Sequence, residues 1–222
     1  MIEKCQPSFY PVVWSHVRVA GMDAPRVVPS LLSPARAATR EKLVAAAIEL
    51  AEEGGYDAVG LRQVAARAGV SVPTVYQHVG SKDQILVEAL MALGAVSTEG
   101  VRARQPRGRT PADRLASVFA RIMREVSAKP LLHQALYRAY VAHAPALARV
   151  EGTVGFGPER ARWIGETLRA GDVAGHTDAE IDSAARILST LFLGAVIGVA
   201  AGRDVDEATQ ILDEATHRLL PQ

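Results

Sequence analysis

The sequence predicts an all-helical protein. Alanine-rich segments with apolar residues three and four positions apart recur along the 222 residues, whereas strand-like alternation and clusters of β-branched residues are lacking. Apolar residues make up 49% of the chain and charged residues 22%, which is ordinary for a soluble globular protein. The single cysteine, Cys5, excludes an intramolecular disulfide and a Cys-x-x-Cys metal site, so a reducing cytoplasm is expected.

Three regions are expected along the chain. Residues 1–35 contain several prolines and are predicted to be a flexible N-terminal arm, within which Met22 is a second candidate for the translational start. The apolar pieces of this arm are too short and too broken for a signal peptide. Residues 36–85 form a small domain, and residues 86–222 form a larger helical domain.

The small domain begins with two helices that end at glycines. They span about residues 35–53 and residues 61–68. Ser71 is placed to cap a short third helix, and Pro73 lies in its first turn. Proline is tolerated there because an N–H in the first turn has no intrahelical partner in any case. A helix of two turns contributes little core. We therefore expect it to present its exposed face to a partner.

The second and third of these helices form a helix-turn-helix. They are joined by a turn of about four residues that contains Gly69. In such a motif the second helix enters the major groove of DNA. The short third helix is therefore predicted to read a double-stranded DNA site.

The segment from Ala38 to Leu90 resembles the DNA-binding domain of TetR-family transcriptional regulators. The shared residues are Gly55-Tyr56, Val64-Ala65, Ala68-Gly69-Val70-Ser71, Thr74-Val75-Tyr76, His78 and Ser81-Lys82. Gly60 departs from the family pattern because a Thr or Ser usually caps the second helix there, and Val79 replaces a usual aromatic residue. The resemblance implies an all-α fold in which a three-helix DNA-binding domain precedes a larger ligand-binding and dimerisation domain.

The resemblance also implies which residues contact the DNA. Phosphate contacts are expected from Tyr76, His78 and Lys82, and further ones from Arg62 and from Thr39 or Arg40. Base contacts are expected from Thr74 and Gln77, with Val72 and Pro73 available for a thymine methyl group.

The charge of the small domain is unusual for a DNA-binding protein. Residues 36–90 contain six basic and seven acidic residues, a net charge of −1, whereas a basic surface is the common pattern. The acidic residues must then lie mostly away from the DNA. The alternative is a ligand-binding or protein-interaction module that no longer binds specific DNA.

The larger domain is predicted to hold a small apolar or amphipathic effector, because the family encloses a small-molecule pocket in this region. The candidate pocket residues are the bulky and adaptable Phe119, Met123, Leu136, Tyr140, Trp163 and Phe192, although for any single one of them ordinary core is the favoured interpretation. The segment Lys129–Tyr140 also resembles the ligand domain of actinobacterial regulators of sterol and lipid catabolism.

A ridge of small residues predicts a dimer. It consists of Thr190, Gly194, Gly198 and Gly202. Glycines inside a helix cost about 1 kcal/mol each relative to alanine, so close packing must offset them. The resemblance implies a homodimer built from the last two helices, which would bind a near-palindromic operator. Close packing within one subunit is the alternative.

Neither a membrane span nor an enzyme is expected. The apolar segment Ile187–Gly202 has 16 residues, fewer than the roughly 20 that cross a bilayer. The six histidines form no metal-binding pair, and no catalytic, cofactor or metal site is expected. The sequence predicts a dimeric, cytoplasmic repressor that a small-molecule effector releases from its operator.

Overall fold

The computed structural model describes residues 34–103, 106–147 and 158–221, so the predicted arm lies almost wholly outside the described residues. The described residues form nine α-helices and no strand, which confirms the predicted fold class. In chain order these are α1 (Pro34–Ala58), α2 (Leu61–Ala68), α3 (Val72–His78), α4 (Lys82–Ala103), α5 (Pro111–Ala128), α6 (Pro130–Leu147), α7 (Pro158–Leu168), α8 (Asp178–Ala200) and α9 (Val205–Leu219).

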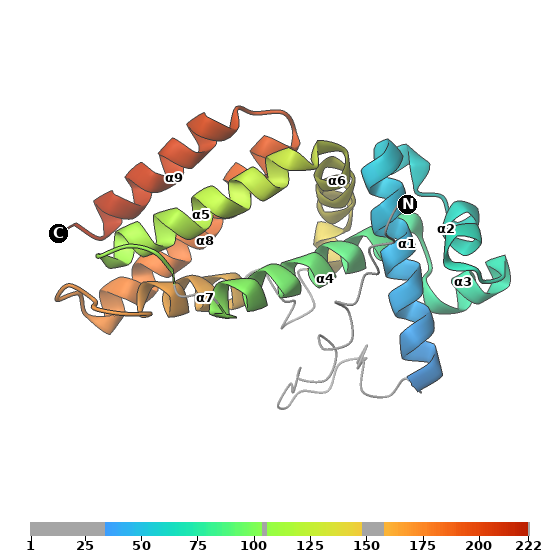
Figure 1. The fold of residues 1–222 in the computed structure, drawn as a ribbon, viewed down its shortest axis with the longest axis horizontal. Helices are drawn as coiled ribbons and strands as arrows, with labels where there is room; N and C mark the ends of the chain where they lie inside the picture. Colours follow the sequence, from blue (N-terminus) through green and yellow to red (C-terminus); the bar gives the residue numbers. More distant parts are fainter. Residues whose placement is uncertain (1–33, 104–105, 148–157, 222) are drawn as a thin grey trace, which may run out of the picture.

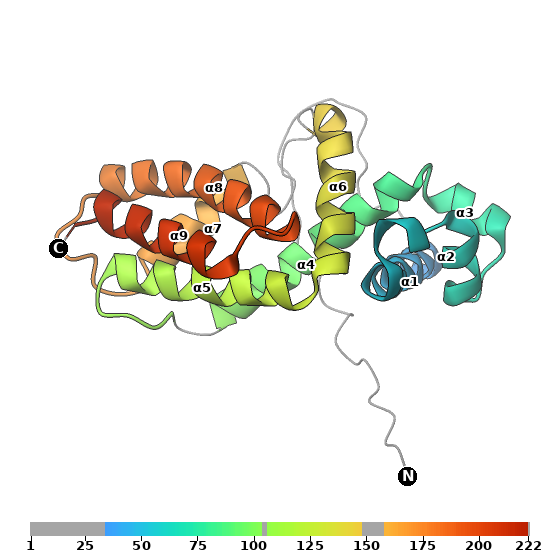
Figure 2. The ribbon, with the colours of Figure 1, turned by 90° about the horizontal axis from the view of Figure 1, so that it is seen from above.

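The helices form two groups joined by α4. Helices α1 to α3 gather at one end of the molecule, and α5, α8 and α9 run alongside one another at the other end (Figures 1 and 2). Helix α4 extends from the first group to the second, and α6 stands between them (Figure 2). The predicted domain boundary at residue 85 therefore falls within α4, which is one continuous helix.

The buried apolar residues form two clusters that match these groups. The first joins α1 to α4 and also includes Leu132, Ala135, Leu136 and Ala139 of α6. The second joins α5, α7, α8 and α9. Tyr137 of α6 packs against both clusters. Helix α6 therefore connects the core of the small domain to the core of the larger domain.

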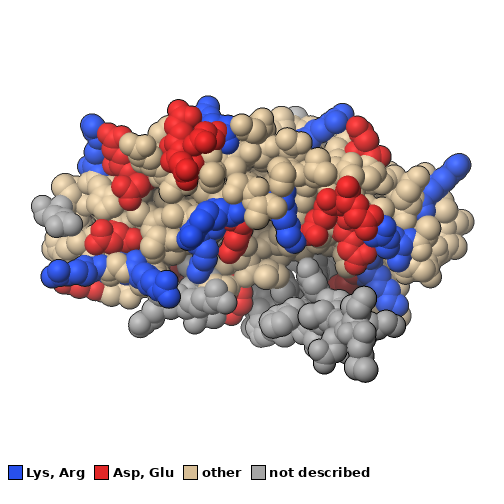
Figure 3. Space-filling view, turned by 45° about the horizontal axis from the view of Figure 1, so that its top comes forward, with Lys and Arg blue, Asp and Glu red and all other residues tan. Residues whose placement is uncertain are grey.

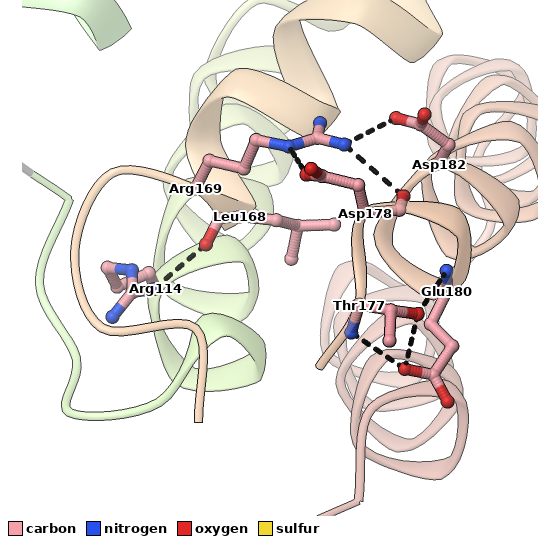
Figure 4. A network of polar contacts seen from close by, with 7 residues as sticks. All are labelled: Arg114, Leu168, Arg169, Thr177, Asp178, Glu180 and Asp182. Carbon is pink, nitrogen blue, oxygen red and sulfur yellow. Dashed lines mark hydrogen bonds and ion pairs between the residues drawn. The ribbon is translucent and has the colours of Figure 1, made fainter. Parts of the chain in front are cut away.

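Most predicted helix ends are present. The predicted first helix is broken at Gly54 and Gly55, whose backbone angles are not helical, although a further turn continues to Ala58. Thr110 and Asp113 form a reciprocal capping box at the start of α5, and Thr177 and Glu180 form another at α8 (Figure 4). These side chains satisfy N–H groups that the first helical turn leaves without a backbone partner.

Gly202 does not lie inside a helix, which corrects the prediction of three helical glycines. Helix α8 ends at Ala200, and Gly202 has a φ of 98° beyond it. The Gly202 N–H donates to the Val199 carbonyl (3.0 Å) and the Arg203 N–H donates to the Gly198 carbonyl (2.9 Å), which is a Schellman motif. Gly202 is needed for the helix end, where a left-handed backbone favours glycine.

The remaining ridge residues lie at or near the surface of α8. Thr190 and Gly194 are exposed, and Gly198 is partly buried beside the Arg203 side chain. Ile187 and Leu191 on the same helix are also exposed, at 45% and 40%. This face of α8 is therefore apolar and uncovered within one subunit.

Helix α8 is longer than its apolar segment suggested. It has 23 residues and is long and apolar enough, by length and composition, to cross a membrane. Half of its apolar window is buried inside the protein, as in a core helix of a soluble protein. Burial against α5, α7 and α9 accounts for the apolar character of its buried face, whereas Ile187 and Leu191 on the other face stay exposed.

A buried arginine joins α5 to the end of α7. Arg114 is 4% exposed, and its Nη2 donates to the carbonyls of Leu168 (2.8 Å, Figure 4) and Asp172 (2.7 Å). The carbonyls at a helix C-terminus carry a partial negative charge, which compensates a buried cation. Arg169 next to this helix end bridges Asp178 (2.9 Å) and Asp182 (2.7 Å) of α8 (Figure 4).

A histidine joins the end of α9 to the start of α5. His217 Nε2 lies 3.2 Å from the carboxylate of Asp113, and its Nδ1 lies 2.9 Å from the Asp213 carbonyl. The Asp213 carbonyl and the Asp113 carboxylate raise the pKa of His217. The hydrogen bonds from Thr110 and His217 lower the pKa of Asp113 to about 2.

Removing the Arg114 cation should destabilise the larger domain. Arg114→Met keeps an apolar stem but leaves the Leu168 and Asp172 carbonyls without this donor, so the free energy of unfolding should fall by about 2–4 kcal/mol. Urea denaturation measures this change. Arg124→Met, an exposed position on the same helix, is the matched control and should change it by less than about 0.5 kcal/mol. Equal effects of the two substitutions would contradict the role of Arg114.

The His217 contact should make stability depend on pH. Because its pKa is raised in the folded protein, protonated His217 contributes stability in full below the unfolded pKa of about 6.5. This contribution is lost as the pH rises through the folded pKa. Substituting His217→Gln should therefore lower the melting temperature more at pH 5.5 than at pH 8.5, as measured by scanning calorimetry. An equal change at both values would exclude the protonated contact.

Candidate nucleic-acid interface

The turn between α2 and α3 has the geometry of a helix-turn-helix. Gly69 is left-handed, with a φ of 68°, and its N–H donates to the Ala66 carbonyl (3.3 Å). The Val70 N–H donates to the Ala65 carbonyl (3.0 Å), which completes a Schellman motif. Two residues later the Ser71 hydroxyl accepts the Thr74 N–H (3.2 Å) and caps α3. The turn is therefore fixed by its own hydrogen bonds.

Helix α3 buries one face and exposes the other. Val75 is fully buried, and Val79 directly after the helix is 2% exposed. The predicted contact residues lie on the remaining surface: Pro73, Tyr76 and Gln77 are exposed, and Val72, Thr74 and His78 are partly buried. Tyr76 is 61% exposed, which is a large aromatic surface to leave in water. The structure thus gathers all of these residues on one short helix, and Arg62 is exposed on α2.

Two predicted contact residues have additional partners. The Thr74 hydroxyl lies 2.7 Å from the Ser71 hydroxyl, so it takes part in the cap of α3. His78 has a pKa below its usual range because of burial, with Arg36 and Arg40 adding to the effect. His78 is then neutral at pH 7 and offers a ring N–H to a phosphate, not a positive charge.

The Arg40 guanidinium is bound within the protein at the C-terminal end of α3, and its expected phosphate contact stays a prediction. Its Nη1 donates to the carbonyl of His78 (3.0 Å), and its Nε and Nη2 bind both carboxylate oxygens of Glu88 (2.8 and 2.5 Å). A bidentate pair of this kind holds both partners in one orientation. Arg40 therefore fixes the C-terminal end of α3 against α1 and α4.

Tyr56 organises a second cluster beside the interface. Its hydroxyl donates to Asp83 (2.5 Å), and this hydrogen bond raises the pKa of Tyr56. The Lys82 Nζ lies 3.7 Å from the centre of the Tyr56 ring, and the guanidinium carbon of Arg138 lies 3.9 Å from it. These are cation–π contacts. They hold Lys82, an expected phosphate contact, and tie it to Arg138 of α6. Sequence reasoning missed the Arg138 contact because Arg138 lies far along the chain.

Ion pairs hold four of the seven acidic residues between positions 36 and 90, counting the Arg40–Glu88 pair. Arg67 binds Glu49 (3.2 Å) and Glu53 (2.8 Å), and Lys129 binds Glu52 (2.6 Å). The surface shows acidic and basic side chains next to one another (Figure 3). The basic residues of the small domain that form no ion pair among the described residues are Arg36, Lys42, Arg62 and Lys82.

The larger domain contains a small cavity next to α4 and α6. Its volume is about 110 Å³. Trp163 and Phe192 of the six predicted pocket residues line it. Phe119 stacks on Phe192 with ring centres 4.9 Å apart and, with Met123, is fully buried in the core of the larger domain. Leu136 is buried in the core of the small domain, and Tyr140 packs against that core.

Other residues of the cavity wall were not singled out from the sequence. They are Leu90, Leu93, Gly94, Ser97, Ile122, Glu125, Val126, His133, Tyr137, Arg160, Leu193 and Val196. Several of these are polar or charged, and the expectation of bulky apolar residues overlooked them. Two of them, His133 and Tyr137, lie four positions apart on α6 and therefore share one face of that helix. This spacing of polar aromatic residues is a signal in the sequence that could have pointed to them.

The fold and the interface define a helix-turn-helix protein with a larger all-helical domain. The family model described as "Bacterial regulatory proteins, tetR family" matches residues 43–89, which span most of α1 to the first part of α4. Residues 43–89 thus match the DNA-binding domain of the TetR family. Among the curated relatives, the HTH-type transcriptional repressor KstR of Rhodococcus jostii (strain RHA1) is 39% identical over 124 residues.

This similarity covers part of each chain. It extends over 54% of this protein and 57% of KstR, so the chain spans about half the length of the curated relatives it matches. The solved structures match over more of the chain. A TetR transcriptional regulator from Rhodococcus sp. RHA1 is 25% identical, with a TM-score of 0.62 over 83% of this chain and 97% of that one. Thermus thermophilus FadR, crystallised with lauroyl-CoA, shares the fold at 24% identity, with a TM-score of 0.63 over 80% of this chain and 92% of FadR.

Replacing Gly69 should weaken the turn that positions α3. A Cβ atom at Gly69 would meet nothing within 4 Å, so the cost of Gly69→Ala arises from the left-handed backbone and should be roughly 1–2 kcal/mol. Gly69→Asn is the control, because Asn tolerates this conformation, and it should cost less. Thermal denaturation ranks the variants. An alanine variant as stable as the asparagine variant would contradict the backbone argument.

Proposed function

We propose that the protein is a homodimeric, cytoplasmic transcriptional repressor that binds a near-palindromic DNA operator through α3 and leaves it when a small-molecule effector binds the larger domain. The observation that carries this proposal is the exposed face of α3 on a turn fixed by Gly69 and Ser71. Helix α3 is too short to contribute much core, and its exposed aromatic and polar groups are suited to phosphates and base edges. The similarity to repressors supports the direction of regulation.

The charge distribution favours DNA binding over the alternative, a ligand-binding or protein-interaction module that binds no specific DNA. The net negative charge of the small domain was the main argument for that rival. Glu49, Glu52, Glu53 and Glu88 are each held by a basic side chain of the protein, so their charges are largely compensated. Lys82 and Arg62 remain to meet phosphates.

An apolar face supports the homodimer. Ile187 and Leu191 of α8 are each at least 40% exposed, on the helical face that also carries Thr190 and Gly194, and Ile211 of the adjacent α9 is 42% exposed. Exposed apolar residues that are grouped in this way mark interaction surfaces. A two-fold dimer through α8 and α9 would present two copies of α3 to successive major grooves, about 34–36 Å apart.

The contacts between the domains suggest how an effector would act. The same helix, α4, begins with Lys82 beside Tyr56 and contributes Leu90 and Leu93 to the cavity wall. Helix α6 contributes Tyr137 to that wall, and its Arg138 lies over the Tyr56 ring. An effector that displaces α6 or α4 would therefore shift Lys82 and the spacing of the two reading helices.

Substitutions at Lys82 and Tyr76 test DNA binding directly. Fluorescence anisotropy with a duplex from the upstream region of the protein's own gene should give tight, sequence-dependent binding that weakens steeply with salt. Lys82→Ala should weaken binding to all duplexes and reduce the salt slope by about 1 per subunit. Tyr76→Phe, which keeps the ring and removes the hydroxyl, should have a smaller effect.

The matched control is Arg124→Ala, which removes an exposed cation from α5 and should leave DNA affinity unchanged. Selection from random-sequence duplexes covers the case in which the operator lies elsewhere. The proposal fails if neither the upstream duplex nor any selected duplex binds more tightly than a scrambled one. It also fails if Lys82→Ala and Arg124→Ala behave alike.

A further inference from the structure

Two neutral polar side chains share one side of the cavity. His133 and Tyr137 both line it, one turn apart on α6, and their rings lie nearly parallel with centres 6.5 Å apart. Burial raises the pKa of Tyr137, so its hydroxyl stays protonated. Burial lowers the pKa of His133, so its ring is neutral at pH 7. The two side chains therefore offer hydrogen bonds without charge.

The hydrogen bond that His133 makes within the protein fixes its tautomer. Its Nδ1 lies 3.0 Å from the Lys129 carbonyl, and a carbonyl oxygen can only accept. Nδ1 therefore carries the proton of the neutral ring, and Nε2 is left as a hydrogen-bond acceptor. No residue that the structure describes donates a hydrogen bond to Nε2.

The Tyr137 hydroxyl is a donor that the protein leaves unused. Among the described residues none accepts a hydrogen bond from it, although the side chain packs against both apolar clusters. A buried tyrosine hydroxyl usually has a partner, because a polar group without one destabilises the folded state. The hydroxyl is not fully enclosed by protein atoms, so a molecule in the cavity can reach it.

The charged residues of the cavity wall favour neither sign of charge. Arg160 already has a partner within the protein, and the exposed Glu125 lies 3.9 Å from Arg121. One cation and one anion leave the wall without net charge. Ser97 of α4 is neutral, and most of the remaining wall is apolar: Leu90, Leu93, Ile122, Val126, Trp163, Phe192, Leu193 and Val196. The cavity therefore suits an uncharged molecule with a mainly hydrocarbon body.

We propose that this cavity binds an apolar alcohol, whose hydroxyl accepts a hydrogen bond from Tyr137 and donates one to His133 Nε2. The inference rests on the proposed function, because this alcohol would be the effector. A hydroxyl group is both a donor and an acceptor, which matches the one acceptor and one donor that the wall offers. Two hydrogen bonds of about 2.8 Å through one oxygen can bridge rings whose centres are 6.5 Å apart.

The cavity volume limits the size of the alcohol in the resting protein. Benzene occupies an engineered apolar cavity of about 150 Å³, so about 110 Å³ accommodates a smaller body. A short alcohol fits with little rearrangement, and a longer one must enlarge the cavity. Two chain lengths therefore report whether the wall can open.

Isothermal titration of the full-length protein at pH 7 tests the inference. The probes are n-butanol and n-hexanol, each compared with its isomer, methyl n-propyl ether or methyl n-pentyl ether. The ethers can accept from Tyr137 but cannot donate to His133. At least one alcohol should bind roughly three- to tenfold more tightly than its ether, because it forms one more hydrogen bond. Absence of binding by both alcohols, equal binding of alcohol and ether, or tighter binding of hexanoate than of n-hexanol overturns the proposal.

Variants assign the two hydrogen bonds. His133→Leu removes the acceptor and should abolish the preference for alcohol over ether, and His133→Gln restores an acceptor oxygen and should recover part of it. Tyr137→Phe removes the donor that both ligands use, so it should weaken both several-fold and keep the preference. A purely structural role of His133 would affect alcohol and ether alike.

The matched control is Gln134→Leu, at an exposed position of α6 that does not line the cavity, and it should keep the preference. If circular dichroism shows that His133→Leu is unfolded, His133→Phe, which keeps a ring beside Tyr137, takes its place. An unchanged preference for alcohol in every folded His133 variant overturns the assignment.

Operator anisotropy with n-hexanol separates this inference from the proposed function. Release of the operator from the unmodified protein but not from His133→Leu supports the inference. Alcohol binding that leaves the operator complex intact overturns the role of the alcohol as effector. A protein that binds the alcohol but no operator keeps the site and overturns the proposed function. Operator release by another compound, with no alcohol binding, overturns the alcohol site and leaves the proposed repressor intact.

Discussion

The arrangement of the molecule depends on α4 being one uninterrupted helix. It begins with Lys82 beside the reading helix, and its middle turns carry Leu90 and Leu93 in the cavity wall. An α-helix transmits displacement along its axis because each residue is hydrogen-bonded to the next turn. Helix α6 closes a second connection, since Tyr137 packs against both cores while Arg138 contacts Tyr56. We therefore expect a change in the cavity to alter the position of α3.

The same contacts explain how a small domain with a net negative charge can face DNA. Three of its acidic residues pair with Arg67 or Lys129, and Glu88 is held by Arg40 under α3. These carboxylates stabilise the packing of α1 against its neighbours while contributing little negative field of their own. Net charge is a poor guide here because the local field at α3 depends on which charges are already compensated.

The local parts of the fold could be predicted from the sequence, and the long-range parts could not. The starts of three helices could be predicted from Ser71, Thr110 and Thr177, because a capping side chain bonds to a backbone N–H within three residues. The turn between α2 and α3 could be predicted from Gly69. Gly202 was misplaced because a glycine ridge and a helix end look alike in sequence. Of the predicted pocket, Trp163 and Phe192 line the cavity, whereas Arg160 was not foreseen. Which apolar residues face a void depends on how whole helices pack.

The small volume of the cavity suggests the direction of regulation. A cavity of about 110 Å³ is below the roughly 300–1,000 Å³ of most ligand pockets, so a sizeable effector must select a more open form. Opening costs free energy, so only a fraction of the molecules is open at any time. The apparent affinity for the effector is then the intrinsic affinity of the open form multiplied by that fraction. Because α4 and α6 contribute residues to the wall, we expect the open form to alter the positions of Lys82 and Arg138 as well. DNA and effector would thus favour different forms, and reciprocity requires each to weaken the binding of the other.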